Sequence, residues 1–593
     1  MRGLLIINNY HAGGLVMKMD YMEEYRRWMD SPSLSEEEWK ELNSISEDEK
    51  EIENRFFAPL EFGTAGLRGT MKTGLHNMNI HIIRHATQAF ADVIKAEGTQ
   101  AMTRGIAIAY DCRNNSEWFA REAACVMAAN GIFARIFDAL RPTPELSFAI
   151  IHYGAAAGLN ITASHNPKEY NGYKVYWDDG AQLPPQKAAA IASRMEEIDI
   201  FTGYKTCDFQ EAVEKGKIEL LGEETDELFR TSVLGEAINP KAVAEAADDL
   251  RIVYTPFHGC GYKMVPEVLH RLGVKNLYPV PEQMVIDGNF PTVKSPNPEN
   301  PEGFYLAVDL AKKVNSDLII GTDPDSDRIG IMACASDGEF VPVTGNQLGV
   351  LLLDYMITSK KAAGTLPENA GAVASIVTTG MARAVAEANG VHFEETFTGF
   401  KFMAERVAQW EAAGSYRYLM AYEESYGYMI GDYVRDKDAV TASMMVAEMA
   451  SYYKLRGMTL LDAMQALYEK YGWFAEKTLN LVMPGVDGLG KMQALMEEFR
   501  SSLPGELAGE SVVRIRDYLD GSIFVTGLGK VDHTPISGSN VLYFEMADGS
   551  TFIIRPSGTE PKIKIYILVR GTDRDDCAEK IQRFYDFAVN IGK

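Results

Sequence analysis

The sequence predicts an α/β protein with three related α/β domains, each built on a mixed sheet, followed by a C-terminal α+β domain. Three observations lead to this fold class. A chain of 593 residues is too long for one hydrophobic core and corresponds to several domains. A pattern of apolar strand, turn, helix and second strand occurs three times. The C-terminal part instead alternates between apolar and polar positions, which is typical of antiparallel sheets.

Two segments precede the first repeat. Residues 1–14 contain one Arg and only four consecutive apolar residues, too short a run for a signal peptide. They are interpreted as a leader ahead of Met17 or Met19. Residues 20–56 are rich in Glu, Trp and Tyr, and Ser35 precedes three glutamates. This order predicts an N-capped, exposed helix.

The first βαβ unit is predicted between residues 105 and 137. Residues 105–110 form an apolar strand, Ser116 caps a helix with one apolar face, and Gly131 ends that helix before the next strand. Two further units have the same order. Their first strands are expected at 250–254 and 372–377, and their helices at 262–272 and 381–389.

The C-terminal domain is predicted from three alternating strands and a last helix. The strands are expected at 541–546, 550–555 and 562–569, and the helix at 575–591. The stretch 481–490, with one proline and three glycines, is the expected hinge leading into this domain.

Composition excludes several classes of function. The formal net charge is −25, which argues against a general nucleic-acid or anionic-membrane surface. A phosphorylated substrate would therefore need a local basic site. No apolar run approaches the length of a membrane span. The six cysteines contain no CxxC pair, which is typical of reduced thiols in a cytoplasmic protein. We expect a cytoplasmic protein that binds neither nucleic acid nor membrane.

Ser164 is the candidate reactive group. It lies in TASHNP, residues 162–167, among small residues and before a proline, so its hydroxyl can be offered to a ligand. The segment follows the apolar run 155–161 and is expected just past a strand, where open α/β sheets bind ligands. Lys174 follows as a cation that could fold back over the serine. A Ser/Asn surface turn is the alternative for these six residues alone.

GTDPDSDRIG, residues 321–330, indicates a metal site. Asp323, Asp325 and Asp327 alternate after an apolar run, so three carboxylates can converge on one cation, as Mg²⁺ prefers. Three like charges so close together are unfavourable unless a cation neutralises them. An EF-hand is excluded because its glycine position is Arg328 and its last glutamate position is Cys334.

Arg68 lies in a glycine-rich segment, residues 61–71. The segment is predicted to be a loop whose main chain can approach a ligand while the guanidinium group points at it. A tight turn with a solvated arginine is the alternative.

Two later segments suit a phosphorylated sugar. RPSGTEP, residues 555–561, offers a concave set of donors for a phosphate dianion. YEESYG, residues 422–427, offers a carboxylate and a hydroxyl two residues apart that suit vicinal sugar hydroxyls. The donors of the first segment are Arg555, Ser557, Gly558 and Thr559, and the groups of the second are Glu423 and Ser425.

Other phosphate and serine chemistries are poorly supported. Residues 485–492 have Walker A spacing, but Met492 stands where the metal-binding Ser or Thr must be. No GxGxxG opens a helix after a strand. Ser164 lies in no GxSxG elbow, which argues against a serine hydrolase.

Together these motifs resemble the α-D-phosphohexomutase superfamily, specifically its phosphoglucomutase and phosphopentomutase branch. FGTAGLRG, TASHNP with Lys174 downstream, GTDPDSDR, FTGFK at 397–401, EES and RPSGTEP occur in the family's order. The resemblance implies four domains around a central cleft, with one loop from each. The domains are placed at 1–222, 223–335, 336–484 and 485–593.

The resemblance also implies residue roles. Ser164 would carry the phosphoryl group, with His165, Lys174 and Arg68 beside it. One Mg²⁺ per chain would be bound by Ser164, Asp323, Asp325 and Asp327. The residues implied in substrate binding are Glu423, Ser425, Lys401, Arg328, Arg555, Ser557, Gly558 and Thr559.

The implied activity interconverts a sugar 1-phosphate and a sugar 6-phosphate, with α-D-glucose as the expected sugar. It would proceed through a phosphoserine and a bisphosphate, with glucose 1,6-bisphosphate as activator, in a monomer or homodimer. Tyr422 and Tyr426 stand where several relatives have other residues, which leaves phosphopentomutase and phosphomannomutase open. A phosphatase or sugar-bisphosphate synthase using the same serine, and an inactive sugar-phosphate-binding phosphoprotein, also stay open.

Overall fold

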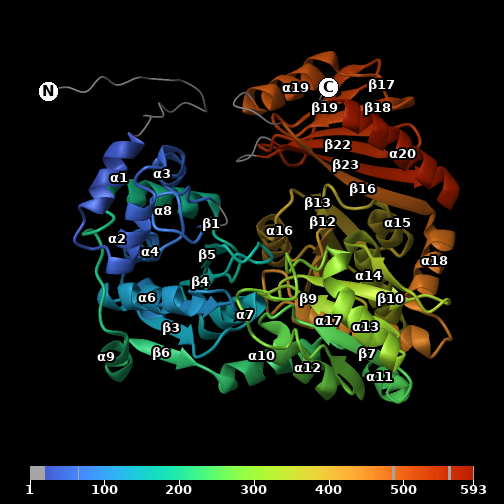
Figure 1. Cartoon of the computed structure of the whole chain (residues 1–593). Helices are drawn as coiled ribbons and strands as arrows, with labels where there is room; N and C mark the ends of the chain where they lie inside the picture. Colours follow the sequence, from blue (N-terminus) through green and yellow to red (C-terminus); the bar gives the residue numbers. More distant parts are fainter. Residues whose placement is uncertain (1–19, 64–65, 484–487, 558–561, 592–593) are drawn as a thin grey trace. The chain divides into compact units, whose positions relative to one another are not determined.

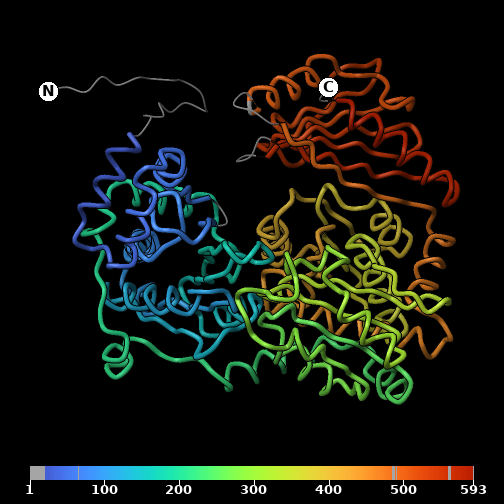
Figure 2. Tube along the Cα trace, viewed as in Figure 1, coloured from blue at the N-terminus to red at the C-terminus, as the bar shows by residue number. Residues whose placement is uncertain are grey.

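The computed structural model describes residues 20–63, 66–483, 488–557 and 562–591. The chain divides into two compact units. Figure 1 labels the elements and Figure 2 follows the trace. Unit 1 comprises residues up to 237 together with 247–331 and 431–447; unit 2 comprises 238–246, 332–430 and the chain from 448 onward.

Unit 1 contains a six-stranded mixed sheet, as predicted. The fifth strand in chain order pairs antiparallel with both of its neighbours, and the other pairs are parallel. In order across the sheet, the strands are β1 (Leu67–Thr70), β5 (Tyr170–Trp177), β4 (Ala157–Ile161), β2 (Ile106–Tyr110), β3 (Ala134–Phe137) and β6 (Ile218–Leu221).

This sheet is buried on both faces because its central strand is apolar on both sides. Ile106 and Ile108 of β2 belong to one hydrophobic cluster, and Ala107 and Ala109 belong to another. The first cluster includes residues of α4 (Ile80–Ala96), α6 (Ser116–Ala129) and α8 (Pro185–Glu197), and the second includes residues of α7 (Thr143–Tyr153). The remaining helices of this region are α5 (Thr99–Arg104), α9 (Phe209–Glu214) and α10 (Glu223–Gly235).

Ser116 does not cap α6 as predicted. Asn115 is the N-cap residue, with a left-handed φ of 67°, and Ser116 is the first residue of the helix. The Ser116 hydroxyl instead donates to Asp111 Oδ1 at 2.7 Å. The helix therefore begins one residue earlier than the capping pattern suggests.

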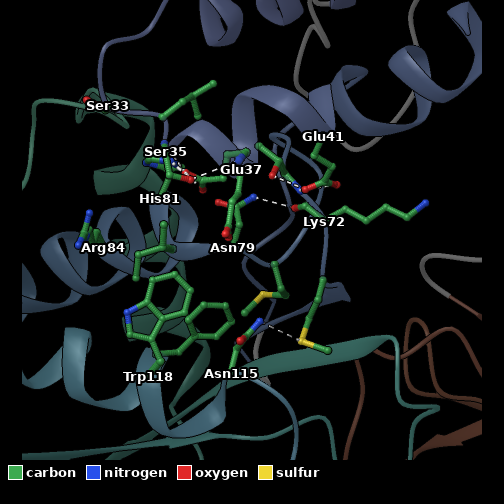
Figure 3. Close-up of a pocket in the computed structure, with 17 residues that line it drawn as sticks. Ser33, Ser35, Glu37, Glu41, Lys72, Asn79, His81, Arg84, Asn115 and Trp118 are labelled. Atoms are coloured by element: carbon green, nitrogen blue, oxygen red, sulfur yellow. Dashed lines mark hydrogen bonds and ion pairs between the residues drawn. The ribbon is translucent and has the colours of Figure 1, made fainter. Parts of the chain in front are cut away.

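Three helices precede the sheet, α1 (Tyr21–Met29), α2 (Glu36–Ser44) and α3 (Glu49–Phe56). The predicted cap at Ser35 is confirmed, since Ser35 and Glu38 form a reciprocal capping box. A pocket of about 550 Å³ lies beside these helices, and Figure 3 shows its lining. None of the predicted site residues lines it.

The second sheet has the order β11-β10-β9-β7-β8 and contains the second predicted βαβ unit. The division between the units falls within β10. The strands are β7 (Arg251–Thr255), β8 (Asn276–Pro279), β9 (Leu318–Thr322), β10 (Ile329–Cys334) and β11 (Phe340–Val343), and the helices are α12 (Gly261–Leu272), η1 (Pro301–Phe304) and α13 (Tyr305–Val314).

Unit 2 contains the third predicted βαβ unit in a four-stranded mixed sheet. Across it the strands are β13 (His392–Thr396), β12 (Ala370–Ser375), β14 (Arg417–Glu423) and β15 (Gly427–Ile430). The helices of this part are α11 (Pro240–Ala246), α14 (Gly345–Ala363), α15 (Gly380–Ala388), α16 (Phe400–Ala413), α17 (Ala439–Lys454), which crosses the division, and α18 (Leu460–Tyr471).

The C-terminal sheet is antiparallel throughout its paired strands, as predicted. Phe552 and Ile554 belong to a cluster with residues of α19 (Gly488–Ser502) and α20 (Arg574–Asn590). Ile553 belongs to a second cluster with Ile376 and Phe397. The strands are β16 (Trp473–Val482), β17 (Glu506–Leu507), β18 (Glu510–Asp517), β19 (Ser522–Val525), β20 (Gly529–His533), β21 (Leu542–Met546), β22 (Thr551–Pro556) and β23 (Lys562–Gly571).

The C-terminal sheet begins earlier in the chain than the predicted fourth domain. β16 pairs with β23 along its whole length, although it lies within 336–484. The four domain boundaries stay a prediction. Residues 484–487 of the expected hinge lie outside the described residues. No helix in the described ranges combines the length and hydropathy that crossing a membrane requires.

Candidate active site

Ser164 lies directly after β4, in the position predicted for it. Its φ is 53°, an uncommon left-handed conformation for a residue with a side chain, and it is only 4% exposed. Ser164 Oγ donates to Asp323 Oδ2 at 2.9 Å and lies 3.3 Å from His165 Nδ1. The serine hydroxyl is therefore held against the aspartate segment.

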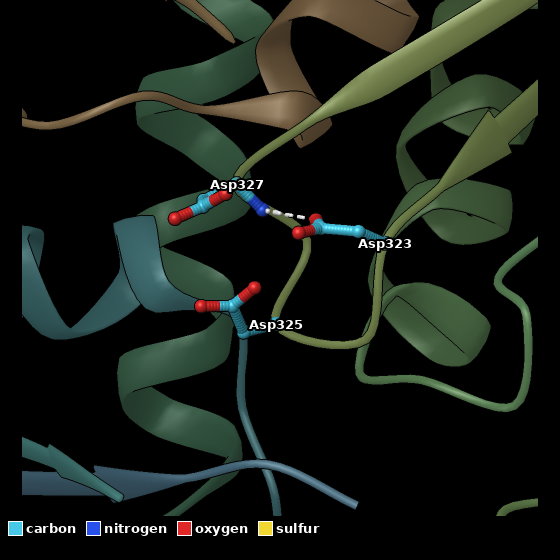
Figure 4. Close-up of side chains that lie close together, drawn as sticks. All are labelled: Asp323, Asp325 and Asp327. Atoms are coloured by element: carbon cyan, nitrogen blue, oxygen red, sulfur yellow. Dashed lines mark hydrogen bonds between the residues drawn. The ribbon is translucent and has the colours of Figure 1, made fainter. Parts of the chain in front are cut away.

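The three aspartates lie together in the turn between β9 and β10 (Figure 4). One carboxylate oxygen from each of Asp323, Asp325 and Asp327 lies within 4.8 Å of the others. The main-chain N–H groups of Asp327 and Arg328 donate to Asp323 Oδ1 at 3.0 and 2.9 Å. The turn thus points its carboxylates inward, as the alternating sequence predicts.

Lysines balance part of this negative charge. Lys174 Nζ lies 2.6 Å from Asp325 Oδ2 and 3.2 Å from Asp327 Oδ2. Burial lowers the pKa of Lys174, but the charges of these two aspartates outweigh it and raise the pKa above its ordinary value. Lys174 is therefore held as a cation beside the carboxylates, and its predicted place over Ser164 stays a prediction.

The cluster fits a divalent cation. Asp325 Oδ1 and Asp327 Oδ1 are buried and accept no hydrogen bond among the described residues. Burial, followed by the charges of Asp325 and Asp327, raises the pKa of Asp323 well above its ordinary value. Buried oxygens without a donor, in a group of carboxylates that repel one another, suit a small hard cation.

Three further cationic or basic groups lie around this cluster. Arg68 Nη1 donates to Asn166 Oδ1 in the serine loop at 3.1 Å, and Arg328 Nη1 lies 3.0 Å from Glu299 Oε1. Burial, with the charges of Arg328 and Arg68, lowers the pKa of His165 well below its ordinary value. His165 is therefore a neutral imidazole beside the serine hydroxyl.

The loop predicted around Arg68 is a strand over residues 67–70. It forms β1, which pairs antiparallel with β5. A Cβ on Gly66, whose φ is 88°, would come within 1.8 Å of Tyr173 O. The glycine therefore lets the main chain join the edge of the sheet.

Sequence reasoning missed three residues of this site. Lys437 Nζ lies 3.0 Å from Asp327 Oδ2, and the Thr143 hydroxyl donates to Asp325 Oδ2 at 2.9 Å. Arg113 donates to main-chain oxygens of the serine loop. The charged run at 435–438, just before the apolar helix α17, was a signal for Lys437. Thr143 carried no comparable signal.

Unit 2 holds the predicted sugar-binding residues. Glu423 ends β14, and its Oε1 accepts a hydrogen bond from the Gly399 N–H at 2.5 Å. This bond joins the EES turn to the FTGFK segment. Lys401 is half-buried in α16, and burial lowers its pKa. Ser425 is half-buried in the turn after β14.

The predicted phosphate-binding segment also lies in unit 2. Arg555, near the end of β22, is opposite Lys564 of β23, which places two cations side by side. Burial and then the charge of Glu424 raise the pKa of the Tyr566 hydroxyl to about 12, while Arg555 opposes this shift through its charge and a hydrogen bond. Ser557 N–H donates to Lys562 O at 2.8 Å. Gly558 and Thr559 lie outside the described residues.

Sequence comparisons find one family along most of the chain. Residues 59–200, 231–335 and 344–471 match the models of phosphoglucomutase/phosphomannomutase α/β/α domains I, II and III. A phosphoglucomutase of Staphylococcus aureus strain bovine RF122 / ET3-1 is 36% identical over 546 residues, which covers 90% of this chain and 94% of that protein.

Solved structures share the fold. The exocytosis-sensitive phosphoprotein pp63/parafusin of Paramecium, a phosphoglucomutase, matches with a TM-score of 0.67 and 18% identity, over 90% of this chain and 95% of its own. A phosphoglucomutase/phosphomannomutase family protein of Burkholderia thailandensis matches with a TM-score of 0.62 and 17% identity, over 89% and 97%.

Proposed function

Because the chain belongs to the phosphoglucomutase/phosphomannomutase family, we propose that it is a phosphosugar mutase that interconverts α-D-glucose 1-phosphate and glucose 6-phosphate. The observation that carries the proposal is the Ser164 hydroxyl, 2.9 Å from Asp323 in a buried carboxylate cluster that Lys174 neutralises in part. Phosphoryl transfer needs such positioning and charge compensation more than covalent chemistry by the protein.

One Mg²⁺ per chain would be held by Ser164, Asp323, Asp325 and Asp327. The two buried aspartate oxygens that accept no hydrogen bond among the described residues support this assignment. When bound, the ion would neutralise negative charge that develops on the phosphoryl oxygens.

Ser164 would carry a phosphoryl group and give it to the free hydroxyl of the sugar phosphate. The P–O bond to Ser164 Oγ breaks, a P–O bond to the sugar oxygen forms, and the sugar hydroxyl loses its proton. The proton ends on Ser164 Oγ, which becomes a hydroxyl again, and His165, 3.3 Å from that oxygen, would relay it. Arg68 and Lys174 are suited to balance charge on the transferring group. The resulting bisphosphate turns round and returns its other phosphoryl group to Ser164.

Residues of unit 2 would hold the parts of the substrate that do not react. Glu423, Ser425 and Lys401 would bind the sugar hydroxyls, and Arg328 of unit 1 would contribute beside the metal turn. The other phosphate would be bound by Arg555, Ser557, Gly558 and Thr559. The adjacent cations on β22 and β23 support a phosphate at this edge of the sheet.

Glucose is the proposed sugar because the Staphylococcus aureus relative is a phosphoglucomutase. Ribose and mannose phosphates are the alternatives, because the resemblance to the family leaves the sugar open at Tyr422 and Tyr426. The proposal includes glucose 1,6-bisphosphate as activator, a cytoplasmic location, and a monomer or homodimer.

A coupled assay with glucose, mannose, glucosamine and ribose 1-phosphates tests the function. We expect the highest kcat/KM with glucose 1-phosphate, stimulation by a trace of glucose 1,6-bisphosphate, and no release of inorganic phosphate. Stoichiometric phosphate release would instead identify a phosphatase. Net accumulation of bisphosphate would identify a bisphosphate synthase.

Ser164→Ala provides the matched control. The change removes one hydroxyl and no packing, so turnover should disappear while the thermal unfolding profile stays unchanged. Substantial turnover in this variant, with no phosphate on another residue, would rule out the serine mechanism.

A further inference from the structure

The loop that carries Ser164 folds around one guanidinium group. Arg113 lies between β2 and α6 and is only 3% exposed. Its Nη2 donates to the main-chain oxygens of Ser164 at 2.6 Å and Asn166 at 2.5 Å. Its Nη1 donates to those of Pro167 at 2.9 Å and Tyr170 at 3.1 Å. Four carbonyl groups of one loop therefore share one side chain.

Arg113 is itself held from two sides. Asp111 Oδ2 lies 3.2 Å from Arg113 Nε, and Asp111 Oδ1 accepts the Arg113 main-chain N–H at 2.9 Å. The guanidinium carbon lies 5.1 Å from the centre of the Phe290 ring. A Cβ on Gly288 would come within 2.5 Å of Asn114 N, so the segment that carries Phe290 lies directly against the Arg113 turn. The guanidinium group has little freedom to move.

The same pair of charges fixes both main-chain polar groups of Ser164. The Ser164 N–H donates to Thr162 Oγ1 at 2.9 Å, and the Thr162 hydroxyl donates to Asp111 Oδ2 at 2.6 Å. The Ser164 carbonyl accepts from Arg113. A left-handed φ in a residue with a side chain is unfavourable and persists only where the surroundings impose it. Here, Asp111 and Arg113 impose it.

We propose that Arg113, held by Asp111 and Phe290, is a positioning residue that keeps the Ser164 loop in the conformation required for phosphoryl transfer. The proposal rests on the proposed function of Ser164. Arg113 acts through the main chain of the loop and through its planar, forked set of donors. A lysine would keep the charge but could not reach four carbonyl oxygens from one fixed plane.

Arg113→Lys and Arg84→Lys form a matched pair. Arg84 is a partly buried arginine of unit 1 that contacts Glu122 and Tyr204 and no residue of the loop. In Arg113→Lys we expect kcat to fall by about 100-fold, because displacement of a reacting group by about 1 Å has an effect of this size. KM for glucose 1-phosphate should stay within about threefold, since substrate binding is not touched. Arg84→Lys should have the same kcat as the wild-type protein.

Hydrogen exchange tests the loop without relying on activity. In Arg113→Lys we expect faster amide exchange in residues 162–170 and unchanged exchange elsewhere in unit 1. In Arg113→Ala, added guanidinium ion should restore part of kcat, whereas Ser164→Ala should gain nothing. An unchanged kcat in Arg113→Lys, unchanged exchange in the loop, or faster exchange throughout unit 1 would each overturn the assignment. Absence of mutase activity in the wild-type protein would instead overturn the proposed function. The exchange result would still decide whether Arg113 holds the loop.

Discussion

Asp325 combines two protein contacts with one oxygen open to a cation. Its Oδ2 accepts from Thr143 and Lys174, and its buried Oδ1 accepts no hydrogen bond among the described residues. Asp325→Asn removes the negative charge of this proposed ligand and should raise the Mg²⁺ concentration for half-maximal activity by more than about 10-fold. Magnesium titrations of activity and calorimetry of binding measure the effect. Asp337→Asn, at an exposed turn, is the control, and full activity after exhaustive chelation would contradict the metal assignment.

Glu424, beside the predicted sugar ligand Glu423, should shape the pH dependence of the reaction. Burial and then the charge of Glu423 raise its pKa to about 7, and Ser375 donates to its Oε2 at 3.1 Å. Below this pKa the carboxyl is neutral. As the pH rises through about 7 it ionises and adds a second negative charge, which should repel a phosphorylated sugar and lower kcat/KM.

Glu424→Gln should remove this decline. Profiles of kcat/KM over the neutral to alkaline range, for the unchanged protein and the variant, make the comparison. Glu368→Gln changes an exposed glutamate of unit 2 and should keep the decline. If Glu424→Gln showed the same alkaline decline, another group would be titrating.

At the residue scale, sequence spacing predicted which side chains come together only where those residues are close neighbours in the sequence. The alternation of Asp323, Asp325 and Asp327 implies convergence because all three belong to one turn. Lys437 and Thr143 reach the same carboxylates from distant segments, and only the fold brings them there. The roles of the site residues stay predictions, since the structure gives their contacts and not their chemistry.

Glu38 of α2 contacts His81 of α4, and the stability that the Glu38 carboxylate contributes should depend on pH. Glu38 Oε1 lies 3.2 Å from His81 Nε2, and Glu38 Oε2 accepts from the Ser35 N–H at 2.9 Å. Burial raises the pKa of Glu38, but the nearby His81 ring and hydrogen bonds from Ser35 outweigh it and lower the pKa to about 2. Because the pKa is lower in the folded chain than its ordinary value of 4.5, the stabilisation is full above pH 4.5 and disappears as the pH falls toward 2.

Glu38→Gln keeps the capping box and removes the charge, since Gln also serves at this position. At pH 7 we expect the free energy of unfolding to fall by about 2 kcal/mol. Scanning calorimetry from pH 7 to pH 3 should show the difference between variant and unchanged protein narrowing below pH 4.5. Glu36→Gln, on a side chain 80% exposed in the same turn, should have little effect. A difference independent of pH would contradict the charge argument.

At the element scale, periodicity and caps located strands and helices where apolar runs are long. β2, β7 and β12 lie within a residue or two of their predicted positions because each is a buried apolar segment. β1 was missed because only four residues pair, and the glycines around them read as a loop. The start of α6 was misplaced because Asn115 adopts a left-handed conformation that the Ser116 pattern does not reveal.

At the scale of the whole molecule, the recurring βαβ pattern predicted three α/β sheets, and the alternation of apolar and polar residues predicted the C-terminal antiparallel sheet. It did not predict where one domain passes into the next. β16 joins the C-terminal sheet through pairing with β23, a strand about 90 residues later, and no local pattern encodes such a partner. The boundary expected near residues 484 and 485 stays a prediction.

The proposed reacting groups and the residue predicted to bind the non-reacting phosphate belong to different units. Ser164 and the aspartates lie in unit 1, and Arg555 lies in unit 2 at the end of β22. A group that binds the non-reacting phosphate contributes nearly equally to ground and transition states, apart from the alignment it imposes. Arg555→Ala should therefore raise KM for glucose 1-phosphate, and should lower kcat by up to about 100-fold through misalignment. Transfer from phosphorylated Ser164 to water should be nearly unchanged, because water has no second phosphate to hold.

Both reactions are measured in one preparation of Arg555→Ala. Arg514→Ala, at an exposed arginine of the same sheet, is the control. A loss of transfer to water as steep as the loss of mutase turnover would place Arg555 at the reacting centre.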